Sequence, residues 1–177
     1  MKYHFSAESS AWAQKVGLGI LNTLCDIHPT YPVSGDGTVD LWTFERVYMG
    51  LRLSCALASS GDKEEAYAAL EDVVELCEKF AILPDGTELS FRCHTFGDAK
   101  AKIKWERTRT AKKEWVSAEL DVYDDEKPLI YISFTIPDVP TREHGWEWFD
   151  PIRNEDRYKA LAKRLEAARA KLEASVK

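Results

Sequence analysis

The apolar residues of this chain follow two periods, and the period changes twice. Before Pro84 they recur every three or four positions, as on one face of an α-helix, and after it they alternate with polar residues, as in a half-buried strand. The helical period returns after Asn154. We therefore predict one α+β domain over residues 1–177. The expected elements are helices at 7–26, 41–59, 63–81 and 155–175 and strands at 88–95, 101–107, 115–123 and 129–136.

Three helices are predicted before the first change of period. The first carries an apolar stripe that we expect to face the core. Its members, at four-residue steps, are Trp12, Val16, Ile20 and Leu24. Gly17 and Gly19 lower the stability of this helix unless another helix approaches closely there. The other two helices form a hairpin, because Gly61 suits the left-handed end of a helix, and Asp62 with Glu65 has the spacing of a capping box.

The hairpin resembles a single tetratricopeptide repeat over residues 47–80. The matching positions are Leu53, Ser54, Leu57, Gly61, Asp62, Glu65, Ala66, Leu70 and Val73, while Gly50 and Glu78 depart from the family pattern. Residues 149–165 are similar to the segment that closes some tetratricopeptide proteins. One repeat cannot bury its own apolar face, so either flanking helices complete the stack or the pattern is that of any capped hairpin. The resemblance implies a tetratricopeptide-like helical layer, to which the last helix returns, with the sheet inserted between hairpin and last helix.

The middle of the chain is predicted to form a four-stranded antiparallel meander. Each of the four runs is apolar on one face and polar on the other, and the connections between them are short. The prolines at 137 and 140 should end the sheet. Asn154 is the expected N-cap of the last helix. The narrow apolar stripe of this helix should pack against a partner helix.

The charge distribution adds one candidate function. The net charge is −6, yet residues 100–113 carry a local charge of +6. Basic and aromatic side chains on a sheet face can hold single-stranded nucleic acid. The candidate contacts are Lys102, Lys104, Arg107, Arg109 and Trp105. However, lysines on an outer strand also prevent edge-to-edge aggregation, and nucleic-acid-binding domains are commonly basic, whereas this chain is acidic.

Further candidate residues lie near the last helix and around the cysteines. Trp146 and Trp148 are candidate ligand contacts, although aromatic residues before a helix more often pin the chain to the core. The four cysteines lack the spacing of a zinc or redox motif, and we predict buried, reduced thiols. Cys93 and His94 are adjacent, but neighbours in a strand point to opposite faces. We therefore predict no catalytic residue, no metal ligand and no cofactor.

Together these patterns favour a non-catalytic binding or adaptor protein that acts through protein–protein interaction. Nucleic-acid binding through residues 100–113 is one alternative, and an enzyme whose site residues are distant in the sequence is another. The first residues lack the apolar run of a secretory signal, and nowhere do about 18 uncharged apolar residues stand together. We expect a cytoplasmic protein with a protein partner and no membrane segment.

Overall fold

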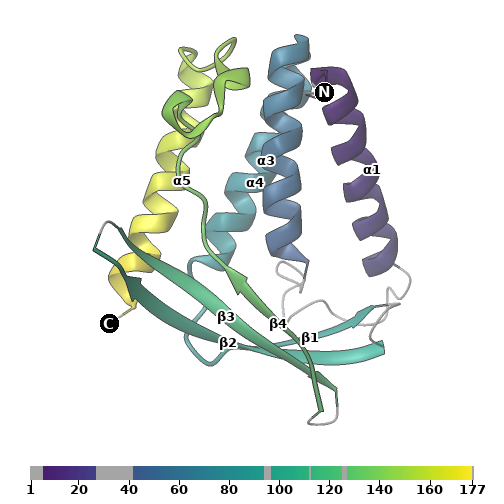
Figure 1. Ribbon diagram of the computed structural model, residues 1–177, viewed down its shortest axis with the longest axis vertical. Helices are drawn as coiled ribbons and strands as arrows, with labels where there is room; N and C mark the ends of the chain where they lie inside the picture. The colour runs from purple at the N-terminus through teal and green to yellow at the C-terminus, as the bar shows by residue number, and fades with distance from the viewer. Residues whose placement is uncertain (1–5, 27–41, 94–96, 112, 125–126, 177) are drawn as a thin grey trace.

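In the part of the chain that the computed structural model describes, four α-helices stand side by side on a four-stranded sheet (Figure 1). The structure describes residues 6–26, 42–93, 97–111, 113–124 and 127–176. The helices are α1 (Ala7–Asp26), α3 (Thr43–Ser60), α4 (Lys63–Phe80) and α5 (Asp156–Ser175). The predicted α+β class is confirmed, and every helix begins and ends within about two residues of its predicted position.

The helices pack in the order α1, α3, α4, α5. The C-terminal helix therefore joins the row beside α4, and the sheet is inserted between these two helices in the chain. Ion pairs along the α4–α5 contact rise together in residue number, which shows that the two helices run in the same direction. These pairs are Lys63–Glu155 (2.5 Å), Arg157–Glu64 (2.9 Å) and Arg164–Glu78 (2.7 Å).

The sheet is the predicted meander. Its strands are β1 (Glu88–Cys93), β2 (Gly97–Arg109), β3 (Glu114–Asp124) and β4 (Lys127–Phe134), and each pairs antiparallel with the next. β2 begins four residues earlier than predicted, because its pairing with β1 continues to Cys93 and Gly97. β4 ends at Phe134, two residues before its predicted end, because the chain leaves the sheet there and rises between α3 and α5 (Figure 1).

The core lies between the helices and the sheet. Alternate residues of β2, β3 and β4 are buried on the helix-facing side, as the two-residue period predicted. Phe134 of β4 is the aromatic centre of this contact. Its ring lies 4.7 Å from that of Phe80 and 6.3 Å from that of Tyr48, in both cases edge to face. The lower ends of α3 and α4 are therefore packed directly on the sheet.

The predicted orientation of α1 is wrong. Trp12, Val16 and Ile20 are 70%, 42% and 55% exposed, and the side chain of Leu24 lies outside the described residues. A smaller face packs against α3 instead, because a Cβ atom at Gly17 would lie only 3.0 Å from Sδ of Met49. Close approach of the two backbones is incompatible with large side chains at the contact. Trp12, Val16 and Ile20 therefore face outward, whereas Leu21 is buried and Leu18 packs partly buried against the core.

Two predicted helix caps also differ from the structure. Gly61 is left-handed at φ +97°, as predicted, but the carboxylate of Asp62 caps no backbone N–H and accepts a hydrogen bond from Ser60 Oγ (3.1 Å). The capping box predicted with Glu65 is therefore absent. The N-cap of α5 is Glu155 in place of the predicted Asn154, and its carboxylate is held by α4. The carboxylates of Asp62 and Glu155 therefore accept hydrogen bonds from neighbouring side chains and not from the backbone N–H groups at the start of each helix.

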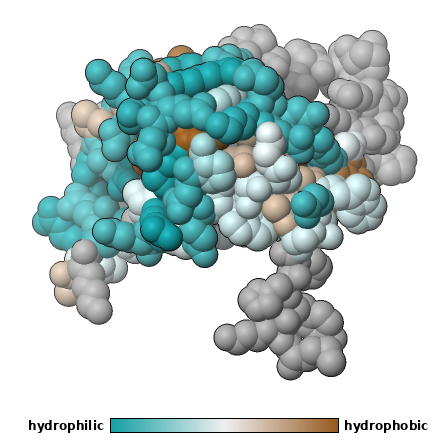
Figure 2. Space-filling model, turned by 90° about the horizontal axis from the view of Figure 1, so that it is seen from above, coloured by the Kyte–Doolittle hydropathy of each residue, from teal (hydrophilic) through white to brown (hydrophobic). Residues whose placement is uncertain are grey.

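The surface at the far end of the helices from the sheet is mainly polar. Figure 2 views this end, where α4 and α5 begin, and most of its residues are hydrophilic. Residues 61–65 of the α3–α4 turn are all exposed there. Among the described residues, no helix combines the length and the apolar character needed to cross a membrane.

Candidate functional site

A cavity of about 460 Å³ opens between the helices and one end of the sheet. Side chains from separate parts of the chain surround it. They are Tyr48 and Leu51 of α3, Lys113 and Trp115 at the β2–β3 hairpin, residues 135–139 after β4, Trp146, and Arg169 of α5. The size falls within the range of ordinary ligand pockets, which are commonly 300–1,000 Å³.

The cavity exists because β4 separates from β3. The two strands pair as far as Ala118 and Phe134, while β3 continues back to Glu114 beside β2 alone. The chain beyond β4 is fixed at Pro140, whose carbonyl oxygen accepts hydrogen bonds from Arg153 Nη1 (2.6 Å) and Tyr158 Oη (2.9 Å). This anchor holds residues 135–139 away from β3, and the space between them is the cavity.

The lining of the cavity is more apolar than polar. Leu51 and Ile136 are almost fully buried at its base, and the rings of Tyr48, Trp115 and Trp146 add aromatic surface. The hydroxyl group of Tyr48 donates to the carbonyl oxygen of Thr135 (3.4 Å), and burial raises the pKa of this phenol. Aromatic rings of this kind bind apolar ligand groups and are typical anchors of protein interfaces.

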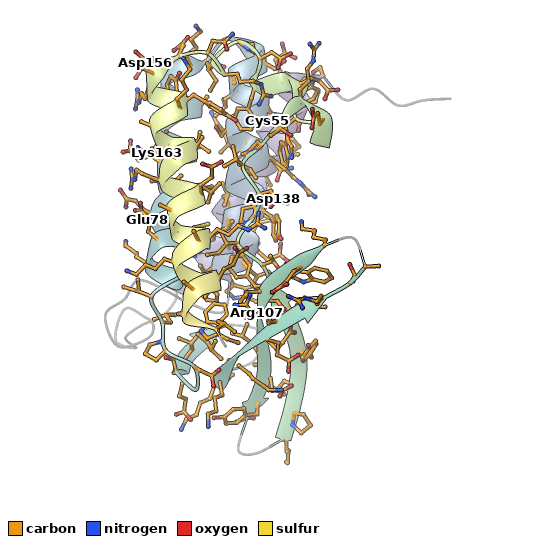
Figure 3. The ribbon with its side chains drawn as sticks, turned by 90° about the vertical axis from the view of Figure 1, so that its left-hand side faces the viewer. Cys55, Glu78, Arg107, Asp138, Asp156 and Lys163 are labelled. Atoms are coloured by element: carbon orange, nitrogen blue, oxygen red, sulfur yellow. The ribbon has the colours of Figure 1, made fainter. Side chains whose placement is uncertain are left out.

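The rim of the cavity carries charge. Lys113 Nζ lies 2.9 Å from Oδ2 of Asp138, and Arg169 pairs with the other oxygen of the same carboxylate. Arg169 also reaches Glu173 one turn along α5, at 2.9 Å. Figure 3 shows Asp138 beside α5, with Arg107 nearer the C-terminal end of that helix. Two cations that share one carboxylate at a partly exposed rim are suited to recognise an anionic group.

The lysines predicted as nucleic-acid contacts lie on the outer face of the sheet. Lys102 stands opposite Asp121 on β3, and Lys104 stands opposite Glu119. Lys104 also hydrogen-bonds Glu106, and this contact raises the pKa of the lysine. The positive charge of β2 is therefore placed against a row of carboxylates, which cross-strand pairing brings together.

Arg107 and Trp105 join the sheet to other parts of the fold, whereas Arg109 pairs within its own hairpin. Arg107 pairs with Glu114 (2.7 Å) and donates to the carbonyl oxygens of Glu173 and Val176 at the C-terminus of α5. Arg109 pairs with Glu114 alone among the described residues (2.7 Å). The indole of Trp105 donates from Nε1 to the carbonyl oxygen of Leu83 (2.9 Å) and packs at 5.3 Å against the ring of Phe80. Trp105 is thus turned toward the helices, away from Lys102 and Lys104.

The two tryptophans before α5 have different positions. Trp146 lines the cavity and contacts the ring of Phe149 at 6.1 Å, whereas Trp148 is partly buried against the core. Of the seven predicted site residues, only Trp146 lies in the cavity. Sequence reasoning missed Tyr48, Trp115 and Arg169, because each sits in the regular pattern of its own helix or strand and only the packing of these elements brings them together.

The described cysteines are buried thiols, as predicted. Burial raises the pKa of both Cys55 and Cys77 to about 12, so neither is a reactive thiolate near neutral pH. The side chains of Cys93, His94 and His144 lie outside the described residues. Among the residues that the structure does describe, no three His, Cys, Asp or Glu side chains are grouped as metal ligands.

No protein-family model, curated protein or solved structure matches this chain.

Proposed function

We propose that this protein is a non-catalytic binding protein that recognises a segment of a partner protein in the cavity between α3, α5 and the sheet. One observation carries the proposal: three aromatic rings and a rim with two cations surround an open cavity of about 460 Å³. Aromatic residues and arginine are the side chains most often responsible for affinity at protein interfaces. The combination suits a segment with an apolar anchor and an acidic group.

The polar groups of the cavity support binding better than catalysis. The carboxylate of Asp138 is held by Lys113 and Arg169, and the hydroxyl of Tyr48 has a raised pKa and is directed to a backbone carbonyl. A general base near neutral pH needs a proton acceptor whose pKa is close to the working pH. The phenol of Tyr48, whose pKa is raised, does not supply one, and the carboxylate of Asp138 is already engaged by two cations.

Nucleic-acid binding through residues 100–113 has less support. The outer lysines of β2 face carboxylates of β3, and Trp105, the predicted base-stacking residue, is turned into the core. Stacking requires an exposed aromatic face. We retain the resemblance of the α3–α4 hairpin to a tetratricopeptide repeat as a proposal, and the two buried reduced thiols support our proposal of a cytoplasmic setting.

A displayed library of random twelve-residue peptides tests this function. We expect the wild-type protein to enrich peptides that bind the cavity. Trp115→Ala should bind the enriched peptides at least about tenfold more weakly, because truncation removes an aromatic anchor of the cavity. Lys104→Glu, on the outer face of the sheet, is the matched control and should bind them as the wild type does. Failure to enrich any peptide, or equal binding by Trp115→Ala, would contradict the proposal.

A further inference from the structure

The register of the sheet determines which backbone groups of β3 point away from β2, toward the side where β4 pairs. In an antiparallel pair, residues alternate between pointing their N–H and C=O groups at the partner and away from it. The N–H of Thr110 donates to the carbonyl oxygen of Lys113 (2.8 Å), which fixes the alternation between β2 and β3. Trp115 consequently points its backbone groups at β2. The N–H and C=O groups of Glu114 and Val116 point the other way.

β4 does not reach these groups. It pairs with Ala118 through Phe134, and an uninterrupted register would place Ile136 opposite Val116 and Asp138 opposite Glu114. The chain has left the sheet by then, and both Ile136 and Asp138 lie on the cavity wall. No backbone hydrogen bond joins these pairs within the described part of the chain. Two consecutive ladder positions of β3 therefore have no strand partner on the side away from β2, within the described part of the chain.

We infer that the cavity accepts an extended segment of the partner protein as an added strand along residues 114–116 of β3, with an acidic side chain set at Lys113 and Arg169. This inference rests on the proposed function and specifies how the segment is held. Main-chain hydrogen bonds to an open strand edge give affinity, and side-chain pockets beside the edge give specificity. The N–H and C=O groups at this strand edge would also be stabilised by hydrogen bonds to the added segment, because unpaired backbone groups away from water cost free energy.

The side chains around the unpaired edge of β3 suit a segment in which apolar and acidic residues alternate. Val116 is buried on the helix-facing side of β3, as are Leu51 and Ile136, so an added strand presents every second residue to this apolar surface. Lys113 and Trp115 lie on the opposite side of β3, where the intervening residue of the segment would project. The matching segment is apolar at one position and acidic at its neighbour.

The charged side chains that line the cavity favour an acidic residue over a basic one in the bound segment. Among the residues that line the cavity, two cations, Lys113 and Arg169, share the single carboxylate of Asp138. The lining itself carries two cations against one carboxylate, and Glu173, which lies outside the lining on α5, also pairs with Arg169. A carboxylate on the segment can pair with either cation, and hydrogen bonds between ionised groups are the stronger class.

The experiment uses peptides enriched from the displayed library, resynthesised with a single N-methyl group at each backbone position in turn. An added strand directs the N–H groups of alternate residues at β3, so N-methylation at two alternate positions should weaken binding at least about tenfold, while the position between them changes it by less than about threefold. Binding is measured by calorimetry with the wild-type protein, and Lys104→Glu serves as the control protein.

A second series replaces the acidic residue of the peptide by its amide. We expect a loss of about fivefold or more with the wild-type protein, and a smaller loss with Arg169→Gln, because the cation that recognises the carboxylate has then been removed. Binding that depends on Trp115 but tolerates N-methylation equally at every position would overturn the added strand and leave the proposed function standing. Equal binding of acid and amide would overturn the assigned charge recognition. Absence of any Trp115-dependent peptide would overturn both proposals.

Discussion

The outer face of the sheet and the cavity beside β3, where β4 leaves the sheet, both contain cations and aromatic residues, yet their charges have different partners. On the outer face, Lys102 and Lys104 of β2 stand opposite Asp121 and Glu119 of β3. Glu119 in turn accepts hydrogen bonds from hydroxyl groups of β3 and β4. Every one of these partners comes from a residue of the same strand or a neighbouring one, because a continuous ladder brings side chains of one face together.

Beside the cavity, the hydrogen-bonded pairing between β3 and β4 stops. Lys113 and Arg169, from a hairpin and a helix, converge on Asp138, which belongs to the chain that has left the sheet. The backbone of β3 loses its neighbour at the same place. The difference indicates that a cluster of basic residues in the sequence does not by itself leave charges without partners, because continuous strands supply partners for their own charges.

The largest expected effect is on the free energy of unfolding, and it distinguishes substitutions on the two faces of β4. Phe134→Ala should lower the free energy of unfolding by about 3–5 kcal/mol, because the ring is fully buried against Phe80 and Tyr48. Tyr131→Ala, on the exposed face of the same strand, should cost less than about 1 kcal/mol. Urea denaturation of both variants measures the difference. Similar losses for the two would contradict the assignment of inner and outer faces.

A smaller effect distinguishes two arginines of β2. Arg107→Ala should lower the free energy of unfolding by about 1–2 kcal/mol, because its guanidinium joins the sheet to the last carbonyl groups of α5. Arg109→Ala removes a mostly exposed ion pair and should cost at most about 0.5 kcal/mol. Chemical denaturation measures both values, and amide hydrogen exchange of α5 should increase only in the Arg107 variant. Unchanged exchange in α5 would argue against this role of Arg107.

The outer face should also show a pH dependence through Glu119. Desolvation acts to raise the pKa of this carboxyl group, but hydrogen bonds from Ser117, Tyr131 and Ser133 outweigh it and lower the pKa below the ordinary value of 4.5. A lowered carboxyl pKa stabilises the folded state above pH 4.5, and this contribution is lost as the pH falls through the folded-state pKa. Glu119→Gln should therefore be less stable than the wild type at pH 7, by about 1 kcal/mol or less.

Comparison of wild type and Glu119→Gln at pH 7 and pH 3 provides the measurement for Glu119. The difference in the free energy of unfolding between the two proteins should decrease as the pH falls below 4.5 toward 3, because the unfolded wild type then binds a proton more readily than the folded protein does. A difference that stays constant over this range would show that the hydrogen bonds from the three hydroxyl groups do not favour the ionised form.

The smallest expected effect concerns the outer lysines. The double variant Lys102→Ala, Lys104→Ala should leave the salt concentration of elution from a single-stranded DNA column unchanged, because these cations already face carboxylates. Each lysine that contacts a phosphate would instead change the slope of log affinity against log salt by about one. A lower elution salt for the double variant would favour the nucleic-acid interpretation of residues 100–113.

Local sequence patterns predicted the elements well and the orientation of one helix badly. The alternation of β2 to β4 identified their buried faces, because neighbouring side chains of a strand must point to opposite sides. The stripe of Trp12, Val16 and Ile20 was assigned to the core, yet it faces outward. Gly17 permits the close approach to α3, and α1 buries Ala11 and Leu21 in place of that stripe.

The sequence by itself determined the helices, the strands and their order, since the period of apolar residues and the position of turn residues depend on near neighbours in the chain. Only the tertiary structure decided the cavity. Its residues come from α3, the β2–β3 hairpin, the chain after β4 and α5, spread from Tyr48 to Arg169. It arises because the anchor at Pro140 draws residues 135–139 away from β3, a contact between distant segments that no local pattern encodes.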